Sequence, residues 1–367
     1  MFFLRPAELT DLPQIEAIAV KSAIGITSLP PDRDRLIDKI TNSRYAFADE
    51  VDIPGEESYF FVLENAATGE IVGTSGLAAA AGFHDRFYSY RNEIIVHASQ
   101  ELKVSNKIHA LHLCHDLTGF SLLTSFYIDP SFADSDLPQL LSRARLLYVA
   151  EQRHRFADKL AAENPGVCNA EGRSPFWDAV GRRFFNMDYP QAEQLSGGRS
   201  KTFIAELMPQ YPIYVPLLPA AAKLAIGQLH PDGELPFSIL MDEGFEADTY
   251  VDIFDGGPTV EARVETLRTV RLQRRLTLLP NITAAAGETT EAIDAAEAGT
   301  AVLSIIANTK SEGFRATIAP AVFGLGADGN HVNFSRETAL LIDVDDGDAV
   351  RVVALDPDSH HLTGASC

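Results

Sequence analysis

Residues 121–150 read SLLTSFYIDPSFADSDLPQLLSRARLLYVA, and this stretch decides how the chain is expected to fold. Its first eight residues, 121–128, include β-branched and aromatic side chains and predict a strand. Asp129 and Pro130 end that strand, because proline has no N–H to donate to a ladder of backbone hydrogen bonds. From Leu140 to Ala150 the apolar residues recur at helical spacing. The sequence therefore predicts a strand that leads through a loop into a helix.

Short elements also precede this stretch. Residues 2–5 predict a strand, and residues 12–19 predict an amphipathic helix that Thr10 or Asp11 can cap. Three further segments are rich in strand-forming residues, and one more is amphipathic like a helix. The predicted strands are 58–63, 70–73 and 92–97, and the predicted helix surrounds 36–40.

Composition limits the class of protein. The chain has 367 residues and is 46% hydrophobic, which suggests two or three domains. Its apolar runs are shorter than the roughly 20 residues that a membrane span needs, so we expect no membrane segment. Cys114, Cys168 and Cys367 are scattered and lack CxxC spacing. We therefore expect no disulfide framework and no structural zinc, as in a reducing cytoplasm.

The net charge narrows the range of partners. Thirty basic residues stand against 51 acidic ones, which gives a formal charge of -21. A surface this negative repels phosphate backbones, so we expect no nucleic-acid partner. It would attract cationic small molecules, although the solubility of an acidic protein explains the charge equally well.

A helix that ends near a glycine and leads to an aromatic strand is predicted twice, at 174–185 and at 235–254. This repetition suggests two similar halves. After about residue 276 the composition changes, and residues 284–301 predict a linker or an exposed helix. Short apolar segments beyond them predict a small β-rich module packed outside the rest; these are 301–306, 314–322 and 349–355.

Six longer words of sequence resemble one family. They are GEESYFFVLE (55–64), NKIHALHLCHDLTG (106–119), SPFWDAVGRRFF (174–185), TFIAELMPQYPIYVPLLP (202–219), IGQLHP (226–231) and YVDIFDGGPT (250–259). They are similar to arginine N-succinyltransferases, over most of residues 1–270. The resemblance implies an α+β fold of the acyl-CoA N-acyltransferase (GNAT) type with a twisted mixed sheet. It also implies transfer of succinyl from succinyl-CoA to the α-amino group of L-arginine or L-ornithine, without a metal or a permanently bound cofactor.

Two features of the sequence resemble the alpha chain of the two-subunit form of this family. These are the phrase SLLTSFYI and the extension after 276. The beta chain and the single-chain enzyme of other bacteria are expected to stop near the equivalent of residue 276. The resemblance implies a beta-subunit partner, or a homo-oligomer. We expect three parts: a GNAT-like half at 1–170, a second α/β half at 171–276, and a linker with a small extension at 277–367.

His230 is the candidate catalytic residue. An amine that attacks a thioester must lose a proton, and the departing thiolate must gain one. Gly227 to Pro231 (GQLHP) resembles the family's His-Pro turn, in which the histidine is the proton donor. Histidine titrates near pH 6.5 and can act as general acid or base. The alternative is a loop histidine that holds the turn before proline.

Ser125, Phe126 and Tyr127 are the candidate residues for binding succinyl-CoA. In this fold the backbone of the corresponding strand hydrogen-bonds the pantetheine arm, as an added strand would. Phe126 falls at or within one residue of the family's succinyl-CoA position. The alternative is an ordinary buried core strand.

The loop after this strand departs from the family's pattern. GNAT proteins have a loop of the form Arg/Gln-x-x-Gly-x-Gly/Ala here, whose N–H groups approach the CoA pyrophosphate. Residues 131–139 (SFADSDLPQ) contain no glycine but include Asp134, Asp136 and Pro138. Either acyl-CoA binds poorly here, or a partner chain supplies the competent site. The second hypothesis is therefore a regulatory or scaffolding subunit that depends on a beta chain for turnover.

His115, Asp116 and Asp255 are candidates for binding the substrate, because carboxylates suit a guanidinium. Asp252 is an equal candidate, and a capping aspartate with a glycine turn explains these residues just as well. His109, His112 and His115 have a spacing of three, which would suit metal ligands on a helix. The segment is strand-like, however, so we expect no metal site.

Overall fold

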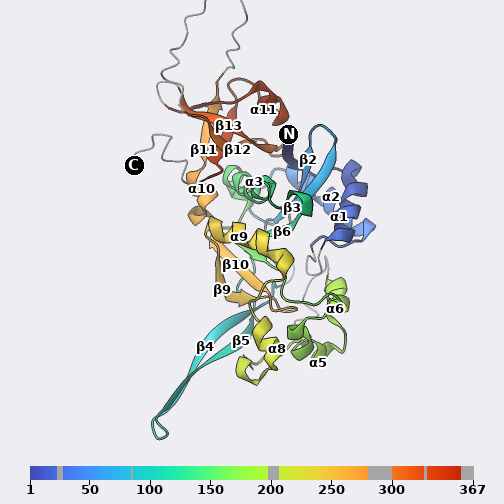
Figure 1. Cartoon of the computed structure of the whole chain (residues 1–367), viewed down its shortest axis with the longest axis vertical. Coiled ribbons are helices and arrows are strands. Elements are labelled where there is room, and N and C mark those ends of the chain that lie inside the picture. Colours follow the sequence, from blue (N-terminus) through green and yellow to red (C-terminus); the bar gives the residue numbers. More distant parts are fainter. Residues whose placement is uncertain (23–27, 84–85, 197–205, 280–299, 326–328, 357–367) are drawn as a thin grey trace, which may run out of the picture.

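The computed structural model describes residues 1–22, 28–83, 86–196, 206–279, 300–325 and 329–356 (Figure 1). The helices are α1 (Leu12–Lys21), α2 (Arg33–Ala48), α3 (Leu137–Glu151), α4 (Pro175–Ala179), α5 (Arg182–Phe185), α6 (Tyr189–Ser196), α8 (Ala220–Ala225), α9 (Glu234–Glu243), α10 (Arg268–Leu272) and α11 (Arg336–Leu341). The strands are β1 (Phe2–Pro6), β2 (Ser58–Asn65), β3 (Glu70–Ala78), β4 (Ser89–Ser99), β5 (Val104–Cys114), β6 (Ser121–Ile128), β7 (Lys159–Glu163), β8 (Ile213–Tyr214), β9 (Glu246–Val251), β10 (Pro258–Arg263), β11 (Arg274–Leu278), β12 (Val302–Asn308), β13 (Ala316–Leu325), β14 (His331–Asn333) and β15 (Ala349–Ala354).

These strands form one mixed sheet along the molecule. Their order is β12-β15-β11-β14-β13-β1-β2-β3-β6-β7-β10-β9-β4-β5-β8. Neighbours are antiparallel except for two parallel pairs, β6 with β7 and β11 with β14. The predicted α+β class with a mixed sheet is confirmed, and so is the predicted order of strand, helix, hairpin, strand and helix.

The centre of the sheet has helices on both faces. Along β2, Phe60 and Val62 pack against α1 and α2, whereas Phe61 and Leu63 pack with α3. Side chains of a strand point alternately to the two faces, so a strand covered on both faces is apolar without interruption. The run YFFVL at 59–63 is fully buried for this reason. The sheet and its helices therefore hold β6 and α3 firmly in place.

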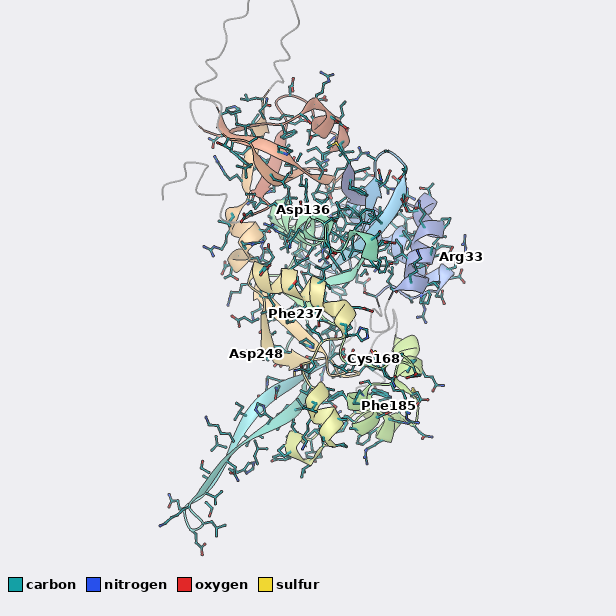
Figure 2. All side chains as sticks on the ribbon, in the orientation of Figure 1. Arg33, Asp136, Cys168, Phe185, Phe237 and Asp248 are labelled. Atoms are coloured by element: carbon teal, nitrogen blue, oxygen red, sulfur yellow. The ribbon has the colours of Figure 1, made fainter. Side chains whose placement is uncertain are left out.

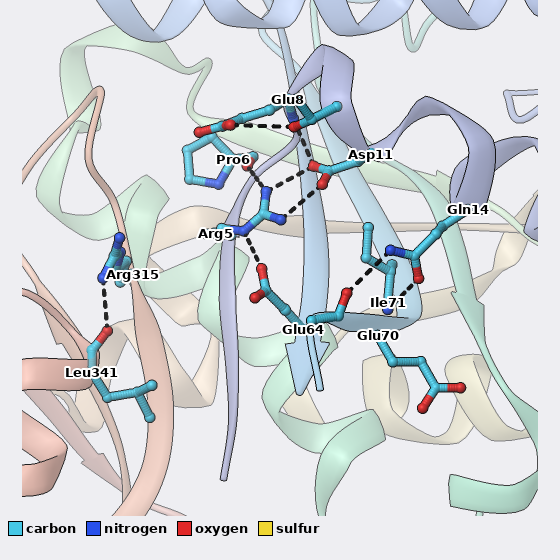
Figure 3. A network of polar contacts seen from close by, with 12 residues as sticks. Arg5, Pro6, Glu8, Asp11, Gln14, Glu64, Glu70, Ile71, Arg315 and Leu341 are labelled. Atoms are coloured by element: carbon cyan, nitrogen blue, oxygen red, sulfur yellow. Dashed lines mark hydrogen bonds and ion pairs between the residues drawn. The ribbon is translucent and has the colours of Figure 1, made fainter. Parts of the chain in front are cut away.

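A partly buried ion-pair network joins β1 to the start of α1 (Figure 3). The guanidinium of Arg5 donates to both carboxylate oxygens of Asp11, at 2.7 and 2.8 Å, and to Glu64 on β2 at 2.5 Å. Asp11 also accepts the backbone N–H of Glu8. Bidentate pairs of this kind fix geometry as well as charge. The network sets the angle between β1 and α1.

The C-terminal strands form a ring of their own. β12, β15, β11, β14 and β13 are neighbours in that order, and β12 also pairs with β13. Ring closure satisfies the strand edges. The predicted β-rich module is thus present, but the expectation that it packs outside the rest is wrong. β13 pairs with β1, and Ile305, Ala307 and Phe314 belong to the central core.

The predicted boundaries at 170 and 276 stay predictions. Residue 276 falls within β11, which pairs with β15. The linker or helix predicted at 284–301 lies, except for its last two residues, outside the described residues.

The repeated pattern that suggested two similar halves does not repeat in the structure. Residues 235–254 contain the predicted helix, α9, which ends at Gly244 with φ of 100°. The strand that follows, β9, spans Glu246–Val251, so it includes only Tyr250 and Val251 of the strand predicted at 250–254. Residues 174–185 instead form two short helices, so the predicted strand at Phe184 and Phe185 is wrong. The ring of Phe185 packs 5.6 Å from that of Trp177, and Asn186, with φ of 50°, ends α5. Tertiary packing on Trp177 has overridden the strand preference of the aromatic pair.

β4 and β5 form a long hairpin that projects from the lower end of the molecule in Figure 1. This confirms the strand predicted at 92–97 and the strand-like character of the segment that contains His109 and His112. His109 and His112 lie on β5, and His115 follows it. The described residues contain no group of three or more metal-binding side chains placed to hold an ion. No described helix is long and apolar enough to cross a membrane.

Candidate active site

A cavity of about 440 Å³ opens between β6 and β7. The two parallel strands pair at only two positions, Ser121 with Leu160 and Leu122 with Ala161, and then diverge. The remainder of β6, as far as Ile128, lines one side of the cavity, and residues 162–165 line the other. Beyond these two positions, neither strand has the other as a backbone partner.

β6 carries an irregularity within the cavity wall. Ser125 has φ of 54°, and the register with β3 shifts opposite it. Its N–H donates to Ser28 Oγ at 2.9 Å, and its carbonyl accepts the hydroxyl of Thr74 at 2.9 Å. A serine with positive φ is held there by these bonds. The predicted residues Ser125, Phe126 and Tyr127 all line the cavity.

Acidic side chains gather at the β7 side of the cavity, where Glu163, Asp252 and Asp255 are among the lining residues. Asp255 is 4% exposed and accepts the N–H groups of Gly166 and Gly257, each at 2.7 Å, and the hydroxyl of Tyr189 at 3.2 Å. Burial, together with the nearby charge of Asp252, raises the pKa of Asp255 to about 7. Burial thus disfavours the charged form of Asp255, and a cationic ligand beside it would favour that form.

The glycines after Asp255 allow this wall to form. Gly256 has φ of 72°, which an L side chain rarely adopts. A Cβ on Gly257 would lie 2.3 Å from the carbonyl oxygen of Asn164. Only glycine thus lets the turn pack against the end of β7. The capping and turn roles foreseen for this segment are present, and substrate binding by Asp255 stays a prediction.

His230 stands beside the cavity, and the residues that follow it, Pro231 to Gly233, line the wall. The backbone N–H of His230 donates to the carbonyl oxygen of Pro165 at 2.9 Å. This bond joins the His-Pro turn to the end of β7. The ring Nδ1 of His230 accepts the N–H of Asp232 at 3.3 Å. The same nitrogen lies 3.6 Å from the carboxylate of Asp232, and the side chain of His230 is 21% exposed.

The glycine-free loop lies at the mouth of the cavity. Pro130 and Ala133 line it, whereas the carboxylates of Asp134 and Asp136 are exposed (Figure 2 labels Asp136). α3 begins at Leu137, whose N–H donates to Ser135 Oγ at 3.3 Å, and Pro138 has no N–H. Few N–H groups remain for an anion at this helix start. The structure thus retains the departure from the family's loop.

The other predicted substrate residues lie elsewhere. Asp116 and His115 follow β5 and do not line the cavity. Asp116 forms an ion pair with Arg91 at 2.6 Å and accepts the hydroxyl of Tyr250 at 3.3 Å. The structure therefore groups His230, Asp255 and the β6 residues, and separates Asp116 and His115 from them. All these roles stay predictions.

Several cavity residues were missed from the sequence. Strand β7 was not predicted, although KLAAE at 159–163 is a short apolar run before Asn164-Pro165. Arg145 also lines the cavity, within the apolar face of α3. A cationic residue among apolar residues of a predicted helix was the available indication, because charged side chains are rarely fully buried.

A mixed sheet whose parallel strands diverge over a cavity, with a helix after the first of them, places the chain in the acyl-CoA N-acyltransferase class predicted from its sequence. A family model described as "Arginine N-succinyltransferase beta subunit" matches residues 2–269, and one for that subunit's C-terminal domain matches residues 288–354. The chain belongs to the arginine N-succinyltransferase family.

Individual relatives agree with this assignment. Arginine N-succinyltransferase subunit alpha of Pseudomonas aeruginosa is 49% identical, over 97% of this chain and 100% of the relative. Subunit beta of the same bacterium is 42% identical, over 75% of this chain and 80% of the relative. The solved structure of arginine/ornithine succinyltransferase subunit AI from P. aeruginosa has a TM-score of 0.83 and 45% identity, and the match covers 97% of this chain and 99% of that one.

The resemblance to alpha chains is confirmed by the identity and coverage of the alpha relative. One argument for it is wrong, however. A model of the beta subunit's C-terminal domain matches residues 288–354, so beta chains do not stop near the equivalent of residue 276. The extension is therefore shared by both chain types and does not distinguish them.

Proposed function

We propose that this chain transfers the succinyl group of succinyl-CoA to the α-amino group of L-arginine or L-ornithine, with His230 as general acid and base. The amine nitrogen attacks the thioester carbon, the C–S bond breaks, the amine loses a proton and the CoA thiolate gains one. Membership of a family whose named members are arginine N-succinyltransferases supports the reaction.

The single observation that carries the proposal is the divergence of β6 and β7 over the cavity. The unpaired edge of β6 can hold a pantetheine arm by backbone hydrogen bonds. At the other wall, Glu163 and Asp252 suit a guanidinium or ammonium group. The His-Pro turn borders the same cavity, so donor, acceptor and proton carrier can meet.

The second candidate is a subunit that keeps the fold but depends on a beta chain for turnover. The glycine-free loop, with Asp134 and Asp136 at the cavity mouth, favours it. So does the existence of separate alpha and beta relatives in one bacterium. In either case we propose a beta chain as partner. We propose the cytoplasm as its location, since Cys114 is a buried thiol that forms no disulfide.

The test is release of free CoA, followed with a thiol reagent, from the purified chain with succinyl-CoA and L-arginine. Turnover by the chain alone that His230→Ala lowers by roughly 10²- to 10⁴-fold would support the first candidate. His154→Ala, at an exposed histidine outside the cavity, is the matched control. Turnover only with an added beta chain would support the second candidate. No turnover in either case would overturn the assignment.

A further inference from the structure

Arg145 is a buried cation without a carboxylate partner. Its side chain projects from α3, and the residue is 2% exposed. Its guanidinium donates only to neutral oxygens: the carbonyls of Ser142, Gly76 and Thr124, and the hydroxyl of Ser142, at 3.2 to 3.4 Å. No carboxylate of the described residues pairs with it. Because a guanidinium has five N–H groups, these four bonds leave capacity for another acceptor.

This arrangement is unfavourable unless a ligand completes it. Desolvation lowers the pKa of Arg145 to about 9, so the group still carries its charge at neutral pH. Buried charges in proteins are usually paired, because an isolated one is strongly disfavoured. An anion with a carboxylate would supply both the missing charge and the missing acceptor.

Arg145 also lies where the acyl donor is expected. It lines the cavity next to Thr124 and Phe126 of β6, and its guanidinium carbon is 5.8 Å from the centre of the Phe126 ring. Among the described residues that line the cavity, the other cation is Lys21, which is exposed and lies near the carboxylate of Asp129. Of these two, Arg145 is the one that is buried and without an acidic neighbour.

We propose that Arg145 determines acyl-donor specificity by pairing with the distal carboxylate of the succinyl group. The inference rests on the proposed function, and it adds the residue that distinguishes a dicarboxylic acyl donor from a neutral one. A site that is built to hydrogen-bond a polar group rejects an analogue that lacks it, because the polar groups of the site are left unpaired. A neutral acyl chain of equal length would leave the guanidinium of Arg145 without a carboxylate partner.

The competing explanation is that Arg145 has only a structural role and joins α3 to β3 and β6 through Gly76 and Thr124. Loss of a structural contact would lower the activity with every acyl donor alike, whereas loss of a carboxylate partner would lower it with succinyl-CoA alone. Butyryl-CoA is the matched donor, because it also has four acyl carbons but lacks the distal carboxylate of the succinyl group.

The experiment compares succinyl-CoA with butyryl-CoA on the full-length chain, with the beta chain added if the wild type needs it. Wild type and Arg145→Met are assayed with L-arginine, and direct binding of each donor is measured by calorimetry. We expect Arg145→Met to lower kcat/KM for succinyl-CoA by roughly 100-fold and to leave that for butyryl-CoA within a few-fold. Arg145→Lys, which keeps a charge but not the planar fork, should fall between. Arg143→Met is the control on the same helix and should keep the wild-type donor ratio.

Equal losses with both donors, or an unchanged ratio, would overturn the proposal. If Arg145→Met does not fold, the wild type still decides, because succinyl-CoA must raise its melting temperature more than butyryl-CoA does. Equal shifts would reject the role of Arg145. Failure of the proposed function is recognised separately: the wild type would then bind succinyl-CoA in preference but form no succinylarginine.

Discussion

Arg143 and Arg145 are two residues apart on α3, and they are 1% and 2% exposed. Their surroundings differ completely. Arg143 contacts the carboxylate of Glu243 at 3.0 Å and donates to Thr269 and to the carbonyls of Ala354 and Leu355. Arg145 has only neutral oxygens around it and a cavity beside it.

The difference teaches how to separate structural from functional charges. Arg143 joins α3 to α9, α10 and the end of β15, so its charge is neutralised when the chain folds. Arg145 keeps a charge that folding does not neutralise. A cation that folding leaves unneutralised beside a cavity implies a ligand. The predictions below test that distinction, beginning with the largest expected effect.

Arg143→Met should lower the free energy of unfolding by about 3 to 5 kcal/mol, as removal of one partner of a buried ion pair usually does. Glu243 is fully buried and would keep only Arg268, at 3.4 Å, as a nearby cation. Urea unfolding measures the loss. The double variant Arg143→Met/Glu243→Leu should recover most of it, because no charge then remains unpaired. A loss that the second substitution does not repair would show that Arg143 acts mainly through packing.

Asp255 is a second buried ionisable residue at the cavity, and its titration should make the stability of the protein depend on pH. Its pKa is raised from 3.8 to about 7, so the folded state holds a proton there that the unfolded state releases between these values. Stability from this group is therefore present at low pH and is lost as the pH rises to about 7.

Asp255→Asn removes the titration but also one acceptor for Gly166 or Gly257, which costs stability at every pH alike. Chemical unfolding between pH 4 and 7 should show wild type losing more stability than the variant over that range. Parallel curves would mean that Asp255 keeps its ordinary pKa and carries its charge throughout.

Arg145→Met should change the free energy of unfolding by less than about 1 kcal/mol. The lost hydrogen bonds are offset because an unpaired guanidinium no longer has to be desolvated. Urea unfolding beside Arg143→Met makes the comparison direct. A loss as large as that of Arg143→Met would make both arginines structural and remove the distinction between them.

The sequence predicted local elements well where one pattern decides them. YFFVL at 59–63 is apolar without a break and forms a strand covered on both faces. The apolar residues within 12–19 recur with the period of a helix, and this segment lies in α1. The ring of C-terminal strands was foreseen only as β-rich, because its closure joins β12 to β13 and β15, a non-local pairing that no local pattern specifies.

The candidate site was predictable only in part, because a local stretch of sequence indicates single residues but not which of them lie together in the fold. His230 and the residues of β6 came from a resemblance of short stretches of sequence. The β6 residues line the cavity, and His230 directly precedes three other lining residues, Pro231 to Gly233. Asp116 was an equal candidate in sequence but lies in an ion pair with Arg91 at the base of the hairpin. Arg145 was missed, because helical spacing shows which face is buried but not whether a buried charge has a partner.

The start of α3 gives the smallest predicted effect. Asp134 and Asp136 are exposed beside the cavity mouth, where a CoA pyrophosphate is expected, and water screens their repulsion. Asp134→Gly/Asp136→Gly should therefore tighten CoA binding by only about two- to five-fold, measured by calorimetry with CoA itself. Asp158→Gly/Asp242→Gly, at two exposed aspartates outside this cavity, controls for the change of two in net charge. The gain must appear equally for succinyl-CoA and butyryl-CoA, since we propose that the loop is near the nucleotide end of the donor and Arg145 near its acyl end. Unchanged CoA affinity in the double variant would mean that this chain does not hold the pyrophosphate at α3, and the beta chain would then have to supply that contact.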